Sequence, residues 1–212
     1  MKTNSEKLLN EIYVMTEDQK IKDKVLQILR IEQSQVNGKF DYYKYVSKEL
    51  ARPVMTGVFH DNGFKVASDA HILIAFKDDY DVSELEGKVV GKDGAFIEGK
   101  YPNWRSVIPD FTSNRTETVK IDFDKWSEFM KAYKADKKLN QERIWVKVGE
   151  QVYNVDLFNL LTIAMKRIGT DEITNSWSQY SATAGVCNGN DGSVALLMPT
   201  FYRDTKEFYV FK

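Results

Sequence analysis

The spacing of apolar residues predicts two helices at the start of the chain. Apolar side chains recur three and four positions apart over residues 8–13 and again over residues 21–29, which is the spacing of one helix face. Thr16 followed by Gln19 resembles a capping box, so we expect the second helix to begin there after a short break. Residues 5–33 are therefore predicted to be mainly helical.

The next part of the chain is typical of strands. The aromatic-rich residues 40–46 and the alternating residues 52–60 favour extended structure. Residues 61–63 are Asp-Asn-Gly, and an Asn-Gly pair supplies the positive φ angles that tight hairpin turns need. We therefore expect residues 64–67 to pair back on the preceding strand and residues 71–76 to form another.

A polar stretch at residues 111–117 is the predicted domain boundary, after which strands and helices start again. Asp124 is the predicted N-cap of one helix, and Asp156 is that of a second helix, which ends at Gly169. Further strands are predicted at residues 119–123, 143–148, 173–178, 181–187 and 194–199. The pattern predicts an α+β fold of two domains, residues 1–112 and 118–212, each an antiparallel sheet packed with helices.

The composition fits a globular protein. Apolar residues make up 42% of the 212 residues, which is enough for a buried core. The 30 basic and 31 acidic side chains give a net charge of −1, which argues against a uniformly basic surface but not against one basic face. Cys187 is the single cysteine, and no apolar run has the length of a membrane span or the form of a signal peptide. We expect a cytoplasmic protein with a buried thiol and no membrane contact.

Three parts of the chain, taken in order, resemble the bacterial sliding clamp, the DNA polymerase III beta subunit. Residues 52–58 (RPVMTGV) and 66–73 (VASDAHIL) are similar to a strand and an "ATDGHRLA"-type segment of that family's middle domain. Residues 98–109 (EGKYPNWRSVIP) resemble the "DGRFPDYRRVLP"-type segment that closes the middle domain. Residues 153–161 (YNVDLFNLL) and 194–199 (VALLMP) resemble a helix start and the terminal strand of the last domain.

The resemblance covers roughly residues 50–200 and omits the family's first domain. Residues 1–45 match poorly, and Ala70 and Ile72 stand where the family usually has Gly and Arg. The chain also continues past residue 200, where the family ends. We expect this tail either to form an extra strand or to lie over the partner-binding pocket described below.

The resemblance implies a protein without enzymatic activity or cofactor that contacts duplex DNA. Its other expected partners are DNA polymerase or further clamp-binding proteins. Family rings contain six domains, so a ring of two-domain chains needs three copies in a head-to-tail homo-oligomer. A monomeric clamp-fold adaptor, which binds protein partners without encircling DNA, is the alternative.

The family holds DNA with helices rich in lysine and arginine, because attraction to phosphate does not depend on base sequence. The corresponding candidates are the basic residues of three predicted helical regions: Lys20, Lys24, Lys125, Lys131, Lys134, Lys138, Lys166 and Arg167. Each could instead be an ordinary solvated lysine or arginine, since cations are favoured near helix C-termini.

Family clamps also bind short partner peptides in an apolar groove near the junction of the second and third domains. Matching of segments gives as candidate groove residues Ser68, His71, Leu73, Pro102, Arg105, Val107, Leu196, Met198 and Pro199. Apolar anchors beside a few polar groups suit such a groove. Leu73, Val107 and Leu196 could instead belong to the core, and His71 could be a hydrogen-bonded structural residue.

Few residues in the sequence support an enzymatic function. The two histidines, His60 and His71, form no zinc-spaced cluster. Carboxylate pairs within residues 78–81 and 122–124 could hold Mg²⁺ for a nuclease, but such pairs are common in turns and at helix caps. A metal-dependent nuclease is therefore kept as a third hypothesis.

Overall fold

A computed structural model describes residues 4–36, 40–77, 85–112, 115–136, 144–177, 183–200 and 209–211. The helices are α1 (Asn4–Met15), α2 (Gln19–Val36), α3 (Phe123–Ala135) and α4 (Val155–Ile168), with 3₁₀ helices η1 (Tyr42–Lys44), η2 (Pro53–Thr56) and η4 (Trp104–Val107). The strands are β1 (Val58–Asp61), β2 (Phe64–Ser68), β3 (Ile72–Lys77), β4 (Val89–Val90), β5 (Phe96–Ile97), β6 (Arg115–Lys120), β7 (Trp145–Val148), β8 (Gln151–Asn154), β9 (Glu172–Trp177), β10 (Gly185–Asn188), β11 (Val194–Leu197) and β12 (Tyr209–Phe211).

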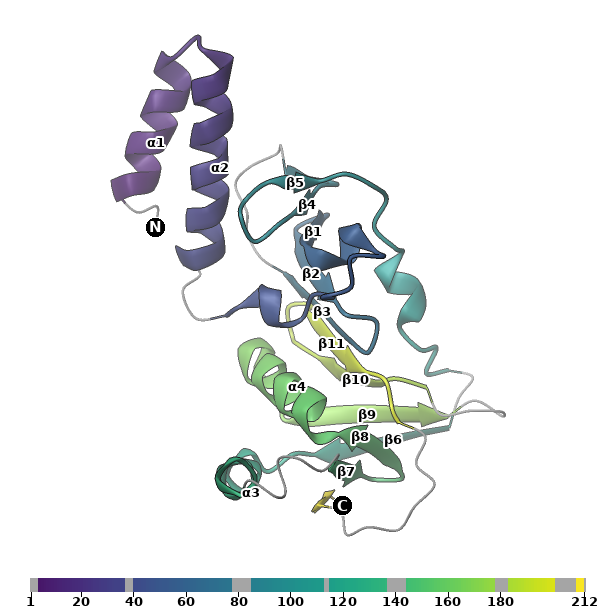
Figure 1. The fold of residues 1–212 in the computed structure, drawn as a ribbon. Helices are drawn as coiled ribbons and strands as arrows, with labels where there is room; N and C mark the ends of the chain where they lie inside the picture. Colours follow the sequence, from purple (N-terminus) through teal and green to yellow (C-terminus); the bar gives the residue numbers. More distant parts are fainter. Residues whose placement is uncertain are drawn as a thin grey trace.

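One antiparallel sheet runs through most of the molecule (Figure 1). Its strand order is β5-β4-β1-β2-β3-β11-β10-β9-β6. Strand β3, from the first half of the chain, pairs with β11, from the second half, so that Ile72 lies opposite Leu197 and Ala75 opposite Val194. The predicted α+β class is confirmed. The predicted division into two domains falls near the start of β6 and stays a prediction, because the sheet joins both halves.

A smaller sheet contains β7, β8 and the tail strand β12. Strand β7 pairs antiparallel with β8 and parallel with β12, where Tyr209 lies opposite Val146. The tail thus forms the extra strand that was one of its two expected conformations. It adds to the edge of β7.

Alternation along the central strands produces two cores, one on each face of the large sheet. Ile72 and Ile74 of β3 and Leu197 of β11 are buried with residues of α3 and α4, whereas Leu73 and Leu196 are buried with Trp104 of η4. Figure 1 shows α3 and α4 on one side of the sheet and η4 on the other. Both faces of β3 and β11 are therefore covered.

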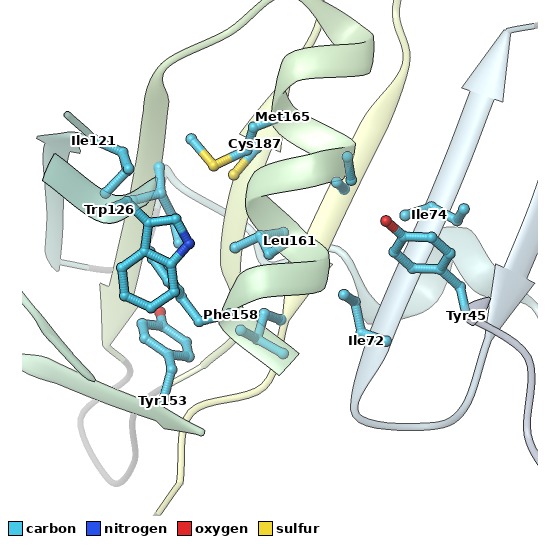
Figure 2. Close-up of a cluster of buried hydrophobic side chains, with 14 of the residues drawn as sticks. Tyr45, Ile72, Ile74, Ile121, Trp126, Tyr153, Phe158, Leu161, Met165 and Cys187 are labelled. Atoms are coloured by element: carbon cyan, nitrogen blue, oxygen red, sulfur yellow. The ribbon is translucent and has the colours of Figure 1, made fainter. Parts of the chain in front are cut away.

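Helix α4 occupies the centre of the first core (Figure 2). Trp126 and Tyr153 lie on one side of it and Ile72, Ile74 and Tyr45 on the other. The Tyr45 hydroxyl donates a hydrogen bond of 2.8 Å to the carbonyl of Leu160, which ties the segment after α2 to α4. Cys187 lies in the same core and is fully buried. The predicted buried thiol is confirmed, and burial raises its pKa.

Three helix caps differ from the predicted ones. The side chains that accept the first free N–H groups belong to Asp18, Asp122 and Asn154, rather than to Thr16, Asp124 and Asp156. In two cases a second residue that can cap a helix stands two positions later, so composition alone does not distinguish them. The predicted helices themselves are present, and Gly169 ends α4 with a φ of 72° as expected.

Three predicted strands are partly or wholly wrong. The strand predicted at residues 119–123 contains only the end of β6, because Asp122 caps α3 and Phe123 begins that helix. Residues 40–46 contain the short helix η1 in place of a strand, because Asp41 accepts a hydrogen bond from the Tyr43 N–H and the rings of Phe40 and Tyr42 pack around Phe76. Pro53 starts the 3₁₀ helix η2 within residues 52–60, so strand β1 begins only at Val58. The predicted hairpin turn at Asn62-Gly63 is confirmed by the β1–β2 pairing, and Asp191-Gly192 makes a second hairpin turn between β10 and β11.

Replacement of Asn154 by Ala tests the cap of α4. The Asn154 side chain accepts hydrogen bonds from the N–H groups of Asp156 (2.9 Å) and Leu157 (3.1 Å). We expect Asn154→Ala to lower the free energy of unfolding by about 1 kcal/mol in urea denaturation. Asp156→Ala is the control, because it removes only a first-turn charge, for which about 0.3–1 kcal/mol is typical. A larger loss from Asp156→Ala would assign the cap to Asp156 instead.

Candidate DNA-contact and partner surfaces

Helices α3 and α4 border a hollow of about 200 Å³ on the side of the sheet that they cover. It is lined by Phe123, Trp126, Ser127, Met130, Lys131, Lys134, Asn159, Thr162, Ile163 and Lys166. Three of the predicted DNA contacts, Lys131, Lys134 and Lys166, thus meet at one place. None of the described residues that line the hollow is acidic, so its charged side chains are these three lysines, although the chain as a whole has a net charge of −1.

The three lysines reach the hollow from two helices. Lys131 and Lys134 are three positions apart on α3, which places them on neighbouring turns of one face. Lys166 lies in the last turn of α4, with its Nζ 4.9 Å from the centre of the Phe123 ring. All three side chains are exposed. Their ammonium groups are accessible to a large anion.

The other predicted DNA contacts lie elsewhere. Lys125 is ion-paired with Asp122 at 3.3 Å, and Arg167, in the last turn of α4, is exposed but does not line the hollow. Lys20 and Lys24 are on α2, which Figure 1 shows at the opposite end of the molecule from α3. Lys138 is outside the described residues.

Several polar residues of the hollow were not predicted from the sequence. Ser127 precedes Lys131 by four positions on α3, so helical periodicity could have placed it on the same face. Asn159 and Thr162 come from α4, and the Thr162 hydroxyl donates to the carbonyl of Asn159 at 2.8 Å. No sequence pattern indicates that α3 and α4 would border one space.

On the other face, Ser68 to Ile72 form a tight turn between β2 and β3. The Ser68 hydroxyl donates to the carbonyl of Ile72 and accepts from the N–H of Ala70. The Asp69 carboxylate accepts from the N–H groups of His71 and Ile72 at 2.8 and 2.9 Å. Ser68 is buried, so it holds the turn and is not exposed to a ligand.

His71 contributes to the structure through its backbone. Its carbonyl accepts a hydrogen bond of 2.8 Å from the N–H of Met198, which fixes the end of β11 beside the turn. The side chain is exposed, and its Nδ1 is 4.0 Å from the Asp69 carboxylate, which is longer than a hydrogen bond. The expected structural role of the imidazole ring itself is therefore wrong.

Residues 98–112 cross the same face of the sheet. The Tyr101 ring stacks on Phe59 of β1 at 4.8 Å, and the Trp104 ring lies 5.6 Å from that of Phe64. Arg105 lies with its guanidinium 4.1 Å from the centre of the Trp104 ring. These contacts hold η4 over β1 and β2.

Asp61 anchors this crossing segment to the β1–β2 hairpin. Its carboxylate accepts a hydrogen bond of 2.7 Å from the Trp104 indole N–H and forms a salt bridge with Arg105. Desolvation alone would raise the pKa of Asp61, but the hydrogen bonds from Trp104 and Arg105 and the charge of Arg105 outweigh it and lower the pKa. Arg105 is thus engaged within the chain.

The candidate groove residues divide into two groups. Leu73 and Leu196 are only 5% and 3% exposed, so they belong to the core, as their alternative interpretation held. Val107 and Met198 are 49% and 42% exposed, and Pro102 and Pro199 are exposed and half-buried, respectively. Val107 and Met198 are thus the two large apolar groove candidates whose side chains are exposed.

Three solved structures have a similar fold over most of the chain. DNA polymerase III subunit beta from Borrelia burgdorferi, in complex with a natural product, matches at a TM-score of 0.52 and 13% identity, covering 81% of this chain and 62% of that one. A proposed DNA polymerase III beta subunit from Eubacterium rectale matches at 0.53 and 11%, covering 82% and 64%. The beta subunit from Thermotoga maritima matches at 0.50 and 14%, covering 76% and 61%. The chain has a sliding-clamp-like fold.

The likeness is one of structure. Sequence comparison alone identifies no matching protein family and no matching curated protein. The chain spans less than two thirds of the length of each of the three beta subunits. Within the described residues, none of the helices combines the length and apolar character needed to cross a membrane.

The backbone conformation at Ala70 accounts for the Gly that the sequence motif has at this position. Ala70 stands where the family usually has Gly, and it has a φ of 76°. This left-handed conformation favours glycine, which accounts for the usual residue. In this chain the side chains of Ser68 and Asp69 accept hydrogen bonds from the N–H groups of Ala70 and Ile72, which stabilises the turn with Ala in the same conformation.

The nuclease hypothesis gains no support from Asp122. Its carboxylate caps α3 and pairs with Lys125. The backbone N–H of Lys125 is the main cause of the lowered pKa of Asp122. Residues 78–81 lie outside the described residues.

Replacement of Asp61 by Asn tests the anchor of the crossing segment. Because folding lowers the pKa of Asp61 below 3.8, its stabilising effect is complete above about pH 4 and is lost as the pH falls through the lower, folded value. We expect Asp61→Asn to reduce the free energy of unfolding by about 1.5–3 kcal/mol at pH 7, and by less at pH 3, which lies below the ordinary pKa of 3.8. Urea denaturation followed by tryptophan fluorescence measures both.

Asp171→Asn is the matched control for Asp61→Asn. Asp171 is exposed, and it contributes only a backbone carbonyl, which accepts from the N–H of Ile121. We expect it to change stability little at either pH. A loss for Asp61→Asn that is the same at pH 7 and pH 3 would contradict the ionic anchor.

Proposed function

We propose that the chain is a clamp-like tethering factor that contacts duplex DNA at the α3–α4 hollow and binds partner proteins on the opposite face of the sheet. The observation that carries this proposal is the meeting of Lys131, Lys134 and Lys166 at one hollow, where no acidic residue lines it within the described part of the chain. Attraction to phosphate is long-ranged and independent of base sequence, which suits a protein that must move along DNA.

Helix electrostatics alone is a weaker explanation of the three lysines. Lys134 and Lys166 lie in last turns, where cations are favoured by the helix dipole. Lys131 lies outside the last turn of α3, and the dipole does not explain why lysines from two helices border the same space. A shared anion explains both features.

Triple replacement of the hollow lysines tests the DNA contact. We expect Lys131→Gln, Lys134→Gln and Lys166→Gln together to weaken binding to a short duplex at least tenfold, because three phosphate contacts are lost. Each phosphate contact contributes about −0.9 to the slope of log K against log salt, so the slope should become less steep by about 2.7. Fluorescence anisotropy over a salt titration measures both quantities.

A second triple variant controls for net charge. Lys48→Gln, Lys92→Gln and Lys100→Gln change the total charge equally, and all three lysines are exposed and outside the hollow. We expect this variant to retain the wild-type salt slope. Equal losses in the two variants would mean that only overall charge matters, and no loss in either would remove the hollow as a DNA contact.

One feature of the large sheet argues against a closed ring. A ring closed by strand pairing needs a free strand edge at each end of the chain. In the described part of the large sheet, one end is β5, which has two residues, and the other is β6, which has six. This asymmetry favours contact with DNA, or with protein partners alone, over encirclement.

Circular DNA distinguishes contact from encirclement. We expect the protein to leave a nicked circular plasmid and its linearised form at the same rate, because an open protein has no topological hold. Gel filtration of preformed complexes at raised salt measures the retained fraction. Selective retention on the circle would favour a closed ring, and absence of DNA binding in both forms would favour the adaptor, with Val107 and Met198 as its exposed apolar contacts.

A further inference from the structure

The N-terminal hairpin of α1 and α2 extends away from the sheet (Figure 1). Leu9 and Tyr13 of α1 are half-buried against α2, and the Nζ of Lys22 lies 5.6 Å from the centre of the Tyr13 ring. Val25 of α2 is buried. The Gln27 side chain donates to the carbonyl of Asp93 at 3.0 Å, which links α2 to the turn between β4 and β5.

A second set of apolar residues on the hairpin faces water. Their exposed fractions are 60% for Leu8, 40% for Ile12, 84% for Met15, 45% for Ile21 and 44% for Ile28. Leu8, Ile12 and Met15 follow the i, i+4, i+7 spacing of one helix face, and Ile21 and Ile28 are seven positions apart. We call these five residues the hairpin face.

Both helices turn their exposed residues to the same side of the hairpin. In each helix an exposed residue directly precedes one that faces the other helix: Leu8 precedes Leu9, Ile12 precedes Tyr13, and Ile21 precedes Lys22. Both helices are right-handed, and they run antiparallel. A residue one position before the helix–helix contact therefore points to the same side of the hairpin in both helices. The result is a two-helix apolar surface of the kind that marks a protein interface.

Two side chains of opposite charge flank the hairpin face at the same height along the helix axes. Glu11 lies three positions after Leu8 on α1, and Lys24 lies three positions after Ile21 on α2. Each is at the margin of its helix that points away from the neighbouring helix, and both are exposed. One margin of the face is therefore negative and the other positive, which makes the face complementary to itself.

We propose that two copies of the chain associate through the hairpin face, with α1 of one copy lying over α2 of the other. A two-fold axis parallel to the helices then brings each Glu11 beside Lys24 of the second copy, twice in one four-helix bundle. The other two-fold arrangement, with the axis across the helices, would place Glu11 beside Glu11 and Lys24 beside Lys24. The charges therefore select the partner and the orientation.

A charge-exchange experiment on the full chain tests this dimer. We expect a wild-type mass of two chains in sedimentation equilibrium. Glu11→Lys and Lys24→Glu should each weaken self-association about tenfold, because each creates two like-charged contacts per dimer. An equimolar mixture of the two variants should associate as tightly as the wild type, since every contact in the mixed dimer is again of opposite charge.

The mixture distinguishes contacts between copies from contacts within one chain. If Glu11 and Lys24 were paired within one hairpin, mixing the two variants would not restore that pairing. Ile12→Asp should abolish the dimer. Val14→Asp is its matched control, since Val14 is 80% exposed and helical spacing places it on the other side of α1. A wild-type mass of one or three chains, or a mixture that associates no better than its components, would overturn the proposal. The proposal would also be overturned if the monomeric wild-type protein bound phosphatidylcholine vesicles and Ile12→Asp abolished that binding.

Discussion

The pairing of β3 with β11 is the interaction on which the other features depend. Five of the six residues of β3 and all four of β11 are buried, as expected for strands in the middle of a sheet with both faces covered. Neither strand could be left as an edge without exposing apolar side chains and free backbone groups. The two halves of the chain are therefore held together by a ladder of hydrogen bonds between their most apolar strands, and not by a surface contact.

This ladder separates two chemically different faces. Alternate residues of β3 and β11 reach α4 on one side and the crossing segment on the other. The helix side exposes lysines, whereas the crossing side is held by aromatic stacking and by the pairing of Asp61 with Arg105. The two ligands of the proposed function, a polyanion and an apolar peptide, would each bind on its own face. Neither ligand has to displace the other.

Local chemistry made part of this fold predictable. The hairpin turns follow from Asn-Gly and Asp-Gly pairs, and α4 follows from its apolar periodicity and the terminal Gly169. Aromatic residues favour strands, so residues 40–46 are predicted as a strand from their composition. The packing of Phe40 and Tyr42 around Phe76 is a tertiary contact that this local preference does not include.

Contacts distant in the sequence were not predictable. Asp61 and Arg105 are 44 positions apart, and no pattern in either segment indicates the other. The common face of Lys131 and Lys134 follows from their spacing on a helix. The addition of Lys166 depends on how α3 packs beside α4 around Trp126 and Phe158, whose rings lie 4.9 Å apart.

The two proposed surfaces, taken together, give a route to DNA tethering that does not need a ring. One hollow with three ammonium groups neutralises about three phosphates, which alone supports only weak, salt-sensitive binding. A two-fold axis along the hairpin helices places both sheets at the same end of the four-helix bundle, so two hollows belong to one assembly. If both reach one duplex, the second contact forms at a high effective concentration, which can raise overall affinity about 10²–10⁴-fold. Residence on DNA would then depend on the hairpin face as much as on the lysines, although the hairpin itself lies apart from the hollow.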